Sequence, residues 1–177
     1  MPGLFIERHA RSVSRHVRVA VLYIHQDDRL VQGNMEVERF QDEELLQLKI
    51  YFRPSRMPLP FLKLMVNICR YIKYHYRGLR MLKKEFGNPD IIHVNVLTRL
   101  GMIALFYKWL SGTSYVITEH WTRYLPQRDN FKGLLRRAVT RLVVSKASAV
   151  MPVTENLRKA MEIHGLRNKN YHVIPNV

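Results

Sequence analysis

The sequence predicts an α/β fold: a Rossmann-like three-layer sandwich with a mainly parallel sheet. Three observations lead to this prediction. Short apolar runs alternate with helical patterns along the whole chain. Two of these runs, 91–96 and 115–118, flank one helical stretch, 101–110, with turn residues at each junction. Nearly continuous apolar strands of this kind occur in parallel sheets that helices cover on both faces.

The composition indicates one domain with a hydrophobic core. Of the 177 residues, 47% are apolar, which excludes a chain that is disordered by composition. No apolar run approaches the roughly 20 residues of a membrane-spanning helix, and residues 1–15 are too polar and charged for a secretory signal. The single cysteine, Cys69, excludes an internal disulfide, and its helical surroundings predict a packed free thiol in a reducing compartment.

The chain is strongly basic. It has 29 Lys and Arg residues against 14 Asp and Glu residues, for a formal charge of +15. Such a charge favours polyanionic partners, which include nucleic acid, anionic lipid and phosphorylated small molecules. The charge alone does not choose among these partners, so the placement of the basic residues matters.

The first third of the chain predicts one helix, 5–15, followed by three strands at 17–24, 35–40 and 45–52. A doubly wound domain normally begins with a strand and a glycine turn before its first helix. Here the glycine, Gly3, is present without the strand. We therefore expect a first strand to be missing from the front of the sequence; a domain that begins with a helix is the alternative.

The longest helical pattern covers 61–86. Apolar residues at spacings of three and four predict one buried face: Phe61, Met65, Ile68, Ile72, Tyr76, Leu79 and Phe86. Basic residues at the same spacing form a stripe on the opposite face: Lys63, Arg70, Lys73, Arg77, Arg80 and Lys84. Gly78 interrupts the pattern and indicates a bend or a break. The stripe is either a solvated outer face or a platform for anionic lipid head groups, where each basic residue contributes about 1 kcal/mol.

The last third predicts a second basic helix, 131–146, a short buried strand, 149–153, a helix, 155–164, and a last strand, 171–174. Thr154 directly precedes the helix 155–164 and stands where the N-cap residue of that helix belongs. The apolar side of the basic helix is expected to consist of Leu134, Leu135, Ala138, Leu142 and Val143.

Ligands of parallel sheets bind outside the carboxyl ends of the strands, so candidate site residues are sought there. Glu119 and His120 follow one strand, and their carboxylate and imidazole can bind sugar hydroxyls or transfer a proton. Asn95 ends the neighbouring strand. On spacing alone, a histidine at a strand end is more often structural than functional, and Asn95 is open to either interpretation. Thr154 is first of all a helix cap, whose hydroxyl can also face an anion.

Several chemistries are excluded by their missing motifs. The sequence has no phosphate-binding GxxxxGK[ST], no GxGxxG, no HExxH and no GxSxG. The eight histidines show no tight ligand spacing, so we expect no metal site.

Five segments of the chain together resemble a known family. They are 3–10, 89–93, 115–120, 151–157 and 172–176. In this order, and over essentially the whole chain, they are similar to the amino-terminal half of a family-four glycosyltransferase with the two-domain GT-B fold. Each segment alone is a weak signal, whereas five in the right order are specific.

The resemblance implies an enzyme that transfers a sugar, of the hexosyl type, from a nucleotide-sugar with retention of configuration and without a metal or other cofactor. Residues 1–177 correspond to the acceptor-side domain. The nucleotide is held mainly by a carboxy-terminal domain that this sequence lacks, so the fragment is expected to be inactive. The implied acceptors are envelope glycans or lipid-linked sugars, which places the enzyme in the cytoplasm, peripherally at the inner face of the plasma membrane.

The resemblance also assigns residues to the site. Gly3 matches the glycine after the first strand, near donor diphosphate and acceptor. His120 matches a histidine near the transferred sugar and is the candidate catalytic residue. Thr154 matches a hydroxyl residue at the edge of the cleft, and Asn176 matches the junction to the second domain. Asn95 stands where many relatives have histidine, so an acceptor contact there is in question.

Two other functions compete with a glycosyltransferase. The first is a basic α/β module that binds nucleic acid; it has the charge, but its basic residues lack interleaved aromatic side chains for base stacking. The second is an adaptor at an anionic membrane surface without catalysis. Nucleic acid is the less expected partner of the two.

Overall fold

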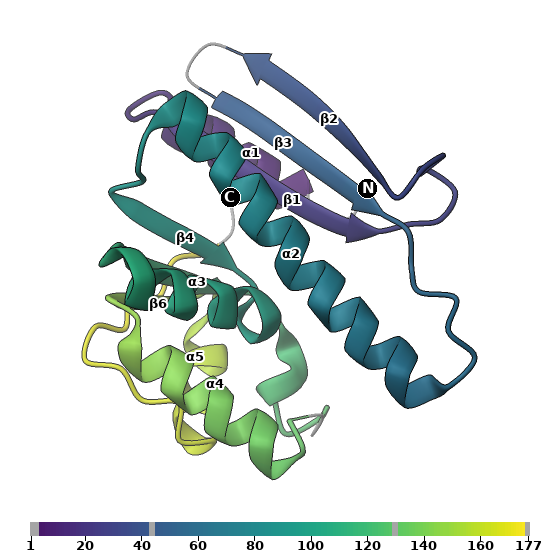
Figure 1. Cartoon of the computed structure of the whole chain (residues 1–177). Helices are drawn as coiled ribbons and strands as arrows, with labels where there is room; N and C mark the ends of the chain where they lie inside the picture. Colours follow the sequence, from purple (N-terminus) through teal and green to yellow (C-terminus); the bar gives the residue numbers. More distant parts are fainter. Residues whose placement is uncertain (1–3, 43–44, 129–130, 176–177) are drawn as a thin grey trace. The chain divides into compact units, whose positions relative to one another are not determined.

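The computed structural model describes residues 4–42, 45–128 and 131–175, without the side chains of Leu4, Phe5 and Thr98. Helices and strands alternate along the chain (Figure 1), and the fold is of the predicted α/β class. The chain divides into two compact units, Met1–Asn88 and Pro89–Val177. Each unit contains one three-stranded sheet.

The first unit is built on a mixed sheet with the strand order β1-β3-β2. Its elements are α1 (Leu4–Ser14), β1 (Val19–Gln26), β2 (Met35–Asp42), β3 (Leu45–Phe52) and α2 (Pro60–Phe86). The central strand β3 runs parallel to β1, with Val19 opposite Leu45, and antiparallel to β2, with Met35 opposite Phe52. The antiparallel β2 is therefore the exception to the predicted parallel order.

Helix α2 packs against this sheet through its second half. Tyr74 and Leu82 join the buried side chains of β3, among them Ile50 and Phe52. Gly78 faces β1 so closely that a Cβ atom there would lie 2.5 Å from Leu22 Cδ1. The predicted bend at this glycine is wrong, because α2 is a single uninterrupted helix (Figure 1). The glycine instead permits close packing of the helix on the sheet.

The predicted buried face of α2 is largely exposed. Phe61 is 71% exposed and Tyr76 is 63% exposed, and Met65, Ile68 and Ile72 are exposed as well. The helix turns a different face to the sheet, one that includes Tyr74, His75 and Gly78. A pattern of purely apolar residues misses this face because an amphipathic aromatic ring and a glycine can pack as well as an aliphatic side chain. Cys69 is also exposed, so the predicted packed thiol is wrong.

The second unit is built on a parallel sheet with the strand order β4-β5-β6. Its elements are β4 (Ile91–Asn95), α3 (Leu97–Ser111), β5 (Ser114–Glu119), the 3₁₀ helix η1 (Thr122–Tyr124), α4 (Leu134–Lys146), β6 (Ala149–Pro152) and α5 (Glu155–Ile163). Ile91 lies opposite Ser114, and Val116 lies opposite Ala149. The predicted strand–helix–strand unit at 91–118 is thus confirmed.

The core of the second unit combines β5 and β6 with all three long helices. Tyr115, Ile117, Val143, Val150 and Met161 are among its fully buried side chains. Strand β5 is buried at Tyr115 and Ile117 on one face and at Thr118 on the other, as expected of a parallel sheet that helices cover on both faces.

Two expectations for the second unit need correction. Helix α4 leaves Leu134 87% exposed and Leu135 79% exposed. Of the predicted apolar side, Val143 is buried, together with Thr140 and Val144. The face of the helix that meets the core is therefore rotated from the predicted apolar stripe. The predicted last strand at 171–174 pairs with β6 only in part: Tyr171 forms a parallel bridge with Val150, and the N–H of Ile174 donates to the Pro152 carbonyl at 3.1 Å.

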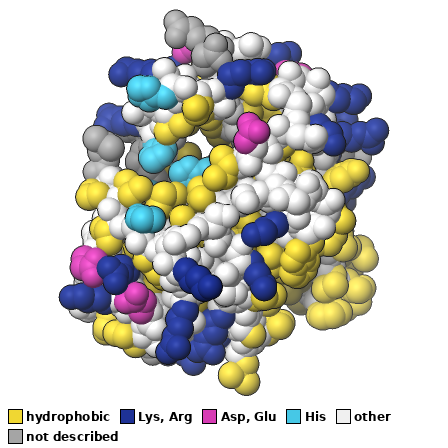
Figure 2. Space-filling view, turned by 90° about the vertical axis from the view of Figure 1, so that its left-hand side faces the viewer, with side chains coloured by type: hydrophobic (Ala, Val, Ile, Leu, Met, Phe, Trp, Pro, Cys, Tyr) yellow, Lys and Arg dark blue, Asp and Glu magenta, His cyan; other side chains and the backbone are white. Residues whose placement is uncertain are grey.

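The surface reflects the basic composition. On the face shown in Figure 2, Lys and Arg side chains outnumber Asp and Glu side chains and lie among exposed hydrophobic groups. Within the described part of the chain, no helix is both long enough and apolar enough to span a membrane.

Candidate functional site

The structure brings three predicted site residues to one edge of the parallel sheet. Asn95 ends β4, His120 directly follows β5, and Thr154 follows β6 and caps α5. The strand register pairs Asn95 with Thr118, and Glu119 with Pro152, so that the three strand ends lie level. The carboxyl edge of this sheet therefore collects an amide, an imidazole and a hydroxyl from three segments that are far apart in the sequence.

Glu119, the fourth predicted residue in this region, points into the protein. Its side chain is completely buried. One carboxylate oxygen accepts hydrogen bonds from the backbone N–H groups of His120 at 3.0 Å and Trp121 at 2.8 Å. The other accepts from the backbone N–H of Leu97 at 3.1 Å and from the Tyr124 hydroxyl at 3.3 Å. The carboxylate thus joins the start of α3, the residues after β5, and η1.

Burial raises the pKa of the Glu119 carboxyl above its ordinary value, because the charged form loses its hydration. The hydrogen bonds from Trp121, Leu97, His120 and Tyr124 act in the opposite direction, since they stabilise the charge. The burial effect is the larger of the two. The local arrangement therefore keeps a carboxyl group inside the protein directly behind His120.

The link between β4 and α3 is strained. Val96 has φ +72°, and it is the one non-glycine residue with positive φ among those that the structure describes. A β-branched residue in this region costs about 1–3 kcal/mol and tends to occur at functional sites. Two hydrogen bonds hold the turn in place: the N–H of Val96 donates to the Thr118 carbonyl at 3.0 Å, and the N–H of Leu97 donates to Glu119.

His120 itself is half-buried at this edge, with its backbone N–H tied to the Glu119 carboxylate. Thr154 is exposed, and its hydroxyl oxygen accepts a hydrogen bond from the N–H of Leu157 at 3.1 Å. The predicted helix cap is thereby confirmed. A hydroxyl that accepts a bond keeps its own O–H as a donor, so the cap can also bind a ligand.

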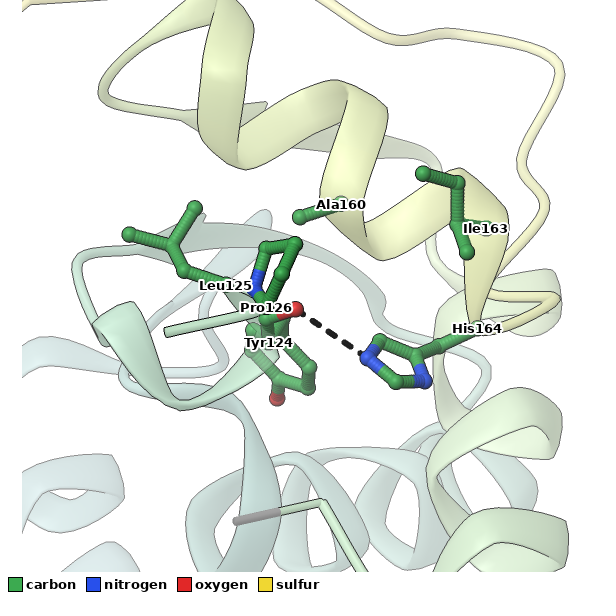
Figure 3. Close-up of a pocket in the computed structure, with 6 residues that line it drawn as sticks. All are labelled: Tyr124, Leu125, Pro126, Ala160, Ile163 and His164. Atoms are coloured by element: carbon green, nitrogen blue, oxygen red, sulfur yellow. Dashed lines mark hydrogen bonds between the residues drawn. The ribbon is translucent and has the colours of Figure 1, made fainter. Parts of the chain in front are cut away.

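A pocket of about 370 Å³ lies beside η1, although the sequence did not indicate it. One wall comes from Tyr124, Leu125 and Pro126, and the other comes from Ala160, Ile163 and His164 at the end of α5 (Figure 3). The Nε2 atom of His164 is hydrogen-bonded to the Tyr124 carbonyl at 3.1 Å and joins the two walls. Tyr124 connects this pocket to the strand edge, because its hydroxyl donates to Glu119.

The remaining predicted residues are Gly3, Asn176 and the basic stripe of α2. Gly3 and Asn176 lie outside the described residues. The basic stripe of α2 belongs to the first unit. In residues 4–42, 45–128 and 131–175, no three His, Cys, Asp or Glu side chains are grouped so that they could hold a metal ion.

Sequence reasoning missed Val96 and Tyr124. Val96 sits in an apolar run, which gives no sign of its positive φ. Tyr124 lies in a polar loop, five residues after Glu119, at a spacing that carries no recognised signal.

Comparison with known families agrees with the resemblance of the five segments. The model of the family described as "Glycosyl transferase 4-like domain" matches residues 5–177, which is nearly the whole chain. None of the curated proteins compared with the chain matches it. The match spans both units, including the strand edge with Asn95, His120 and Thr154. The chain therefore belongs to the family of glycosyl transferase 4-like domains.

Proposed function

We propose that residues 1–177 form the acceptor-side lobe of a retaining, hexosyl-type glycosyltransferase with the two-domain GT-B fold. Its donor is a nucleotide-sugar, and its acceptor is an envelope glycan or a lipid-linked sugar. The observation that carries this proposal is the family match over residues 5–177. The polar side chains at the carboxyl edge of the parallel sheet support it, because this edge is where such sheets bind ligands.

Within this proposal, His120 lies next to the transferred sugar and is the candidate catalytic residue. Asn95 and Thr154 contact the substrate from the neighbouring strand ends. Glu119 supports the same site from behind through its hydrogen bonds to the backbone of His120 and Trp121. Gly3 is assigned to the substrate by its motif alone.

The donor nucleotide is assigned to a second domain, so residues 1–177 alone are expected to bind acceptor weakly and to transfer no sugar. The proposal includes no metal and no organic cofactor; the nucleotide-sugar is a co-substrate. The alternative of a nucleic-acid-binding module rests on charge alone, whereas the family match favours a transferase.

The decisive experiment is a His120→Ala substitution in the enzyme that contains this domain. Loss of a group that interacts with the reacting sugar is expected to lower kcat/KM by about 10²–10⁴-fold. His16→Ala, which changes an exposed histidine of the first unit, is the matched control and should leave transfer unchanged. Equal rates for the His120 variant and the unaltered enzyme would rule out this site.

We also propose that the enzyme works at the inner face of the plasma membrane, with the basic stripe of α2 against anionic lipid head groups. Lys63, Lys73, Arg77, Arg80 and Lys84 are exposed along this helix. Arg70 is half-buried and donates to the Arg53 carbonyl at 2.8 Å, so it contributes to packing.

A further inference from the structure

Two side chains that follow His120 in the sequence are stacked on one another. The guanidinium carbon of Arg123 lies 3.3 Å from the centroid of the Trp121 indole ring, in a cation–π contact. Trp121 directly follows His120, and Arg123 lies in η1. Because consecutive Cα atoms are about 3.8 Å apart, the Cα atom of Arg123 lies within about 11 Å of that of His120. The stacked pair therefore stands close to the candidate catalytic residue.

The residues on both sides of Arg123 are held by the buried carboxylate of Glu119. The backbone N–H of Trp121 donates to this carboxylate at 2.8 Å, and the Tyr124 hydroxyl donates to it at 3.3 Å. Segment 121–124 is thus tied to the protein interior at both of its ends. The guanidinium of Arg123 is presented from a fixed backbone.

In the part of the chain that the structure describes, the guanidinium of Arg123 has no hydrogen-bond acceptor at two of its nitrogen atoms. These atoms, Nε and Nη1, are both buried. The stack on Trp121 uses the face of the guanidinium and leaves its N–H groups free, because they lie in the guanidinium plane. Glu119 is the nearest carboxylate in the sequence, but it accepts from four other donors. A buried cationic donor without an acceptor costs free energy, and an anionic ligand would offset this cost.

The pair also reaches the surface, because Arg123 is half-buried and Trp121 is 40% exposed. A guanidinium can bind a phosphate or a carboxylate through two parallel N–H···O bonds, which gives such contacts geometric specificity. Partial burial against an indole ring lowers the local dielectric and strengthens the attraction between opposite charges. An anionic group therefore fits this place better than an uncharged sugar hydroxyl.

We propose that Trp121 and Arg123 form a binding site for a negatively charged group of the acceptor, with Arg123 determining acceptor specificity. This inference deepens the proposed function and rests on it, because it places the charged group beside the sugar that His120 is assigned to contact. Two sources can supply such a group: the phosphate of a lipid–diphosphate linkage and the carboxylate of an acidic sugar. Both present oxygen atoms that a guanidinium binds in the same way.

A purely structural stack predicts a different behaviour. If Arg123 served only to cover the indole ring of Trp121, its replacement would change the stability of the chain or the emission of Trp121. The affinity for anions would stay the same. Binding measurements on Arg123 variants therefore separate the two roles.

Trp121 allows binding to be measured directly. The chain has two tryptophans, and the other, Trp109, is 62% exposed on α3. In residues 1–177 with Trp109→Phe, the emission of Trp121 should change saturably as sodium diphosphate or sodium glucuronate is added at constant ionic strength. Glucose, the uncharged counterpart of glucuronate, should cause no saturable change. Saturation by diphosphate alone supports the site and indicates a phosphate linkage, whereas saturation by glucuronate alone supports it and indicates an acidic sugar.

The decisive variant is Arg123→Gln, which should weaken binding of the saturating anion by at least about tenfold. Arg128→Gln removes the same charge from an exposed position of the same loop. It is the matched control and should weaken binding by less than about twofold, because an exposed charge is screened. Arg123→Lys keeps the charge without the planar guanidinium and should give an intermediate affinity. Unfolding midpoints will verify that each variant is folded.

Three results would overturn the inference: no saturable response to either anion, undiminished binding by Arg123→Gln, or equal losses of affinity in Arg123→Gln and Arg128→Gln. The last result would show a general attraction of anions to a basic chain. Sugar transfer is not part of this assay. A complete enzyme that transfers no sugar would contradict the proposed function, while the anion site would still be judged by these binding measurements.

Discussion

One buried carboxylate organises the strand edge at the level of single residues. Glu119 accepts four hydrogen bonds from Leu97, His120, Trp121 and Tyr124, which lie in three different segments. A buried N–H that loses its acceptor costs about 1–3 kcal/mol. The position of His120 therefore depends on a side chain that itself lies inside the protein.

Removal of this carboxylate should destabilise the chain strongly. For Glu119→Ala we expect a loss of at least about 3 kcal/mol in the free energy of unfolding, because several buried donors lose their acceptor together. Urea unfolding followed by circular dichroism will measure it. Glu162→Ala removes a half-exposed carboxylate paired with Arg158 at 3.4 Å and should cost less than about 1 kcal/mol. Similar losses for both variants would argue against the organising role of Glu119.

The raised pKa of Glu119 also predicts how the stability of the folded chain changes with pH. Below the ordinary carboxyl pKa, the group is protonated in both the folded and the unfolded chain and contributes nothing. As the pH rises from that value through the raised folded pKa, the unfolded chain gives up its proton first, so the stability of the folded state falls. The stability difference between the unaltered chain and Glu119→Gln should therefore shift in favour of Gln across this range. A shift in the opposite direction would show that the hydrogen bonds outweigh the burial.

At the level of single elements, close packing between α2 and its sheet determines which residue fits at position 78. Gly78 lies in the middle of α2, where alanine would ordinarily favour the helix by about 1 kcal/mol. A Cβ atom at this position would meet Leu22 Cδ1 at 2.5 Å and Ile50 Cδ1 at 3.1 Å. The close contact with β1 and β3 therefore favours glycine at position 78, although helix propensity alone would favour alanine.

Gly78→Ala is expected to destabilise the first unit by about 1–3 kcal/mol, because the added methyl group overpacks the helix–sheet contact. Thermal and urea unfolding will test this expectation. Lys73→Ala, at an exposed position of the same helix, should change stability by no more than about 0.5 kcal/mol. A Gly78→Ala chain that is more stable than the unaltered chain would show that propensity outweighs packing here.

The whole molecule combines a charge of +15 with a family match that spans both units. Under the proposed function, residues 1–177 contribute the acceptor side of a site whose donor nucleotide is bound by another domain. Residues 1–177 alone should therefore bind the same class of acceptor as the complete enzyme, but they should not transfer sugar to it.

We accordingly expect residues 1–177 alone to transfer no sugar from a nucleotide-sugar, while the enzyme that contains them does. Product formation with a labelled donor and a lipid-linked acceptor will measure both. Heat-denatured chain serves as the blank. Transfer by residues 1–177 above this blank would contradict the assignment of the donor site to a second domain.

Much of this fold could be predicted from local patterns. The strand–helix–strand unit around β4 and β5 follows from apolar runs and turn residues, and the Thr154 cap follows from its place before a helix. The same patterns placed Asn95, His120 and Thr154 at strand ends, because a parallel sheet collects such ends at one edge. Their chemical roles stay predictions.

Other features could not be predicted, because they depend on which other parts of the chain each segment packs against or forms hydrogen bonds with. The apolar residues of α2 were expected inside, yet Tyr74, His75 and Gly78 occupy the contact with the sheet. Glu119 was expected to reach substrate, yet its carboxylate accepts backbone N–H groups inside the protein. The last predicted strand pairs with β6 only through one bridge at Tyr171 and one further backbone hydrogen bond, from Ile174 to Pro152.

Sequence alone determined the alternation of strands and helices, the basic charge and the family, because each of these is encoded in local composition and in the order of short motifs. Tertiary structure decided which face of α2 is buried against its sheet and which oxygen atoms hold the strand edge together. Burial and hydrogen bonding belong to pairs of segments, and no single segment specifies the surface against which it will pack.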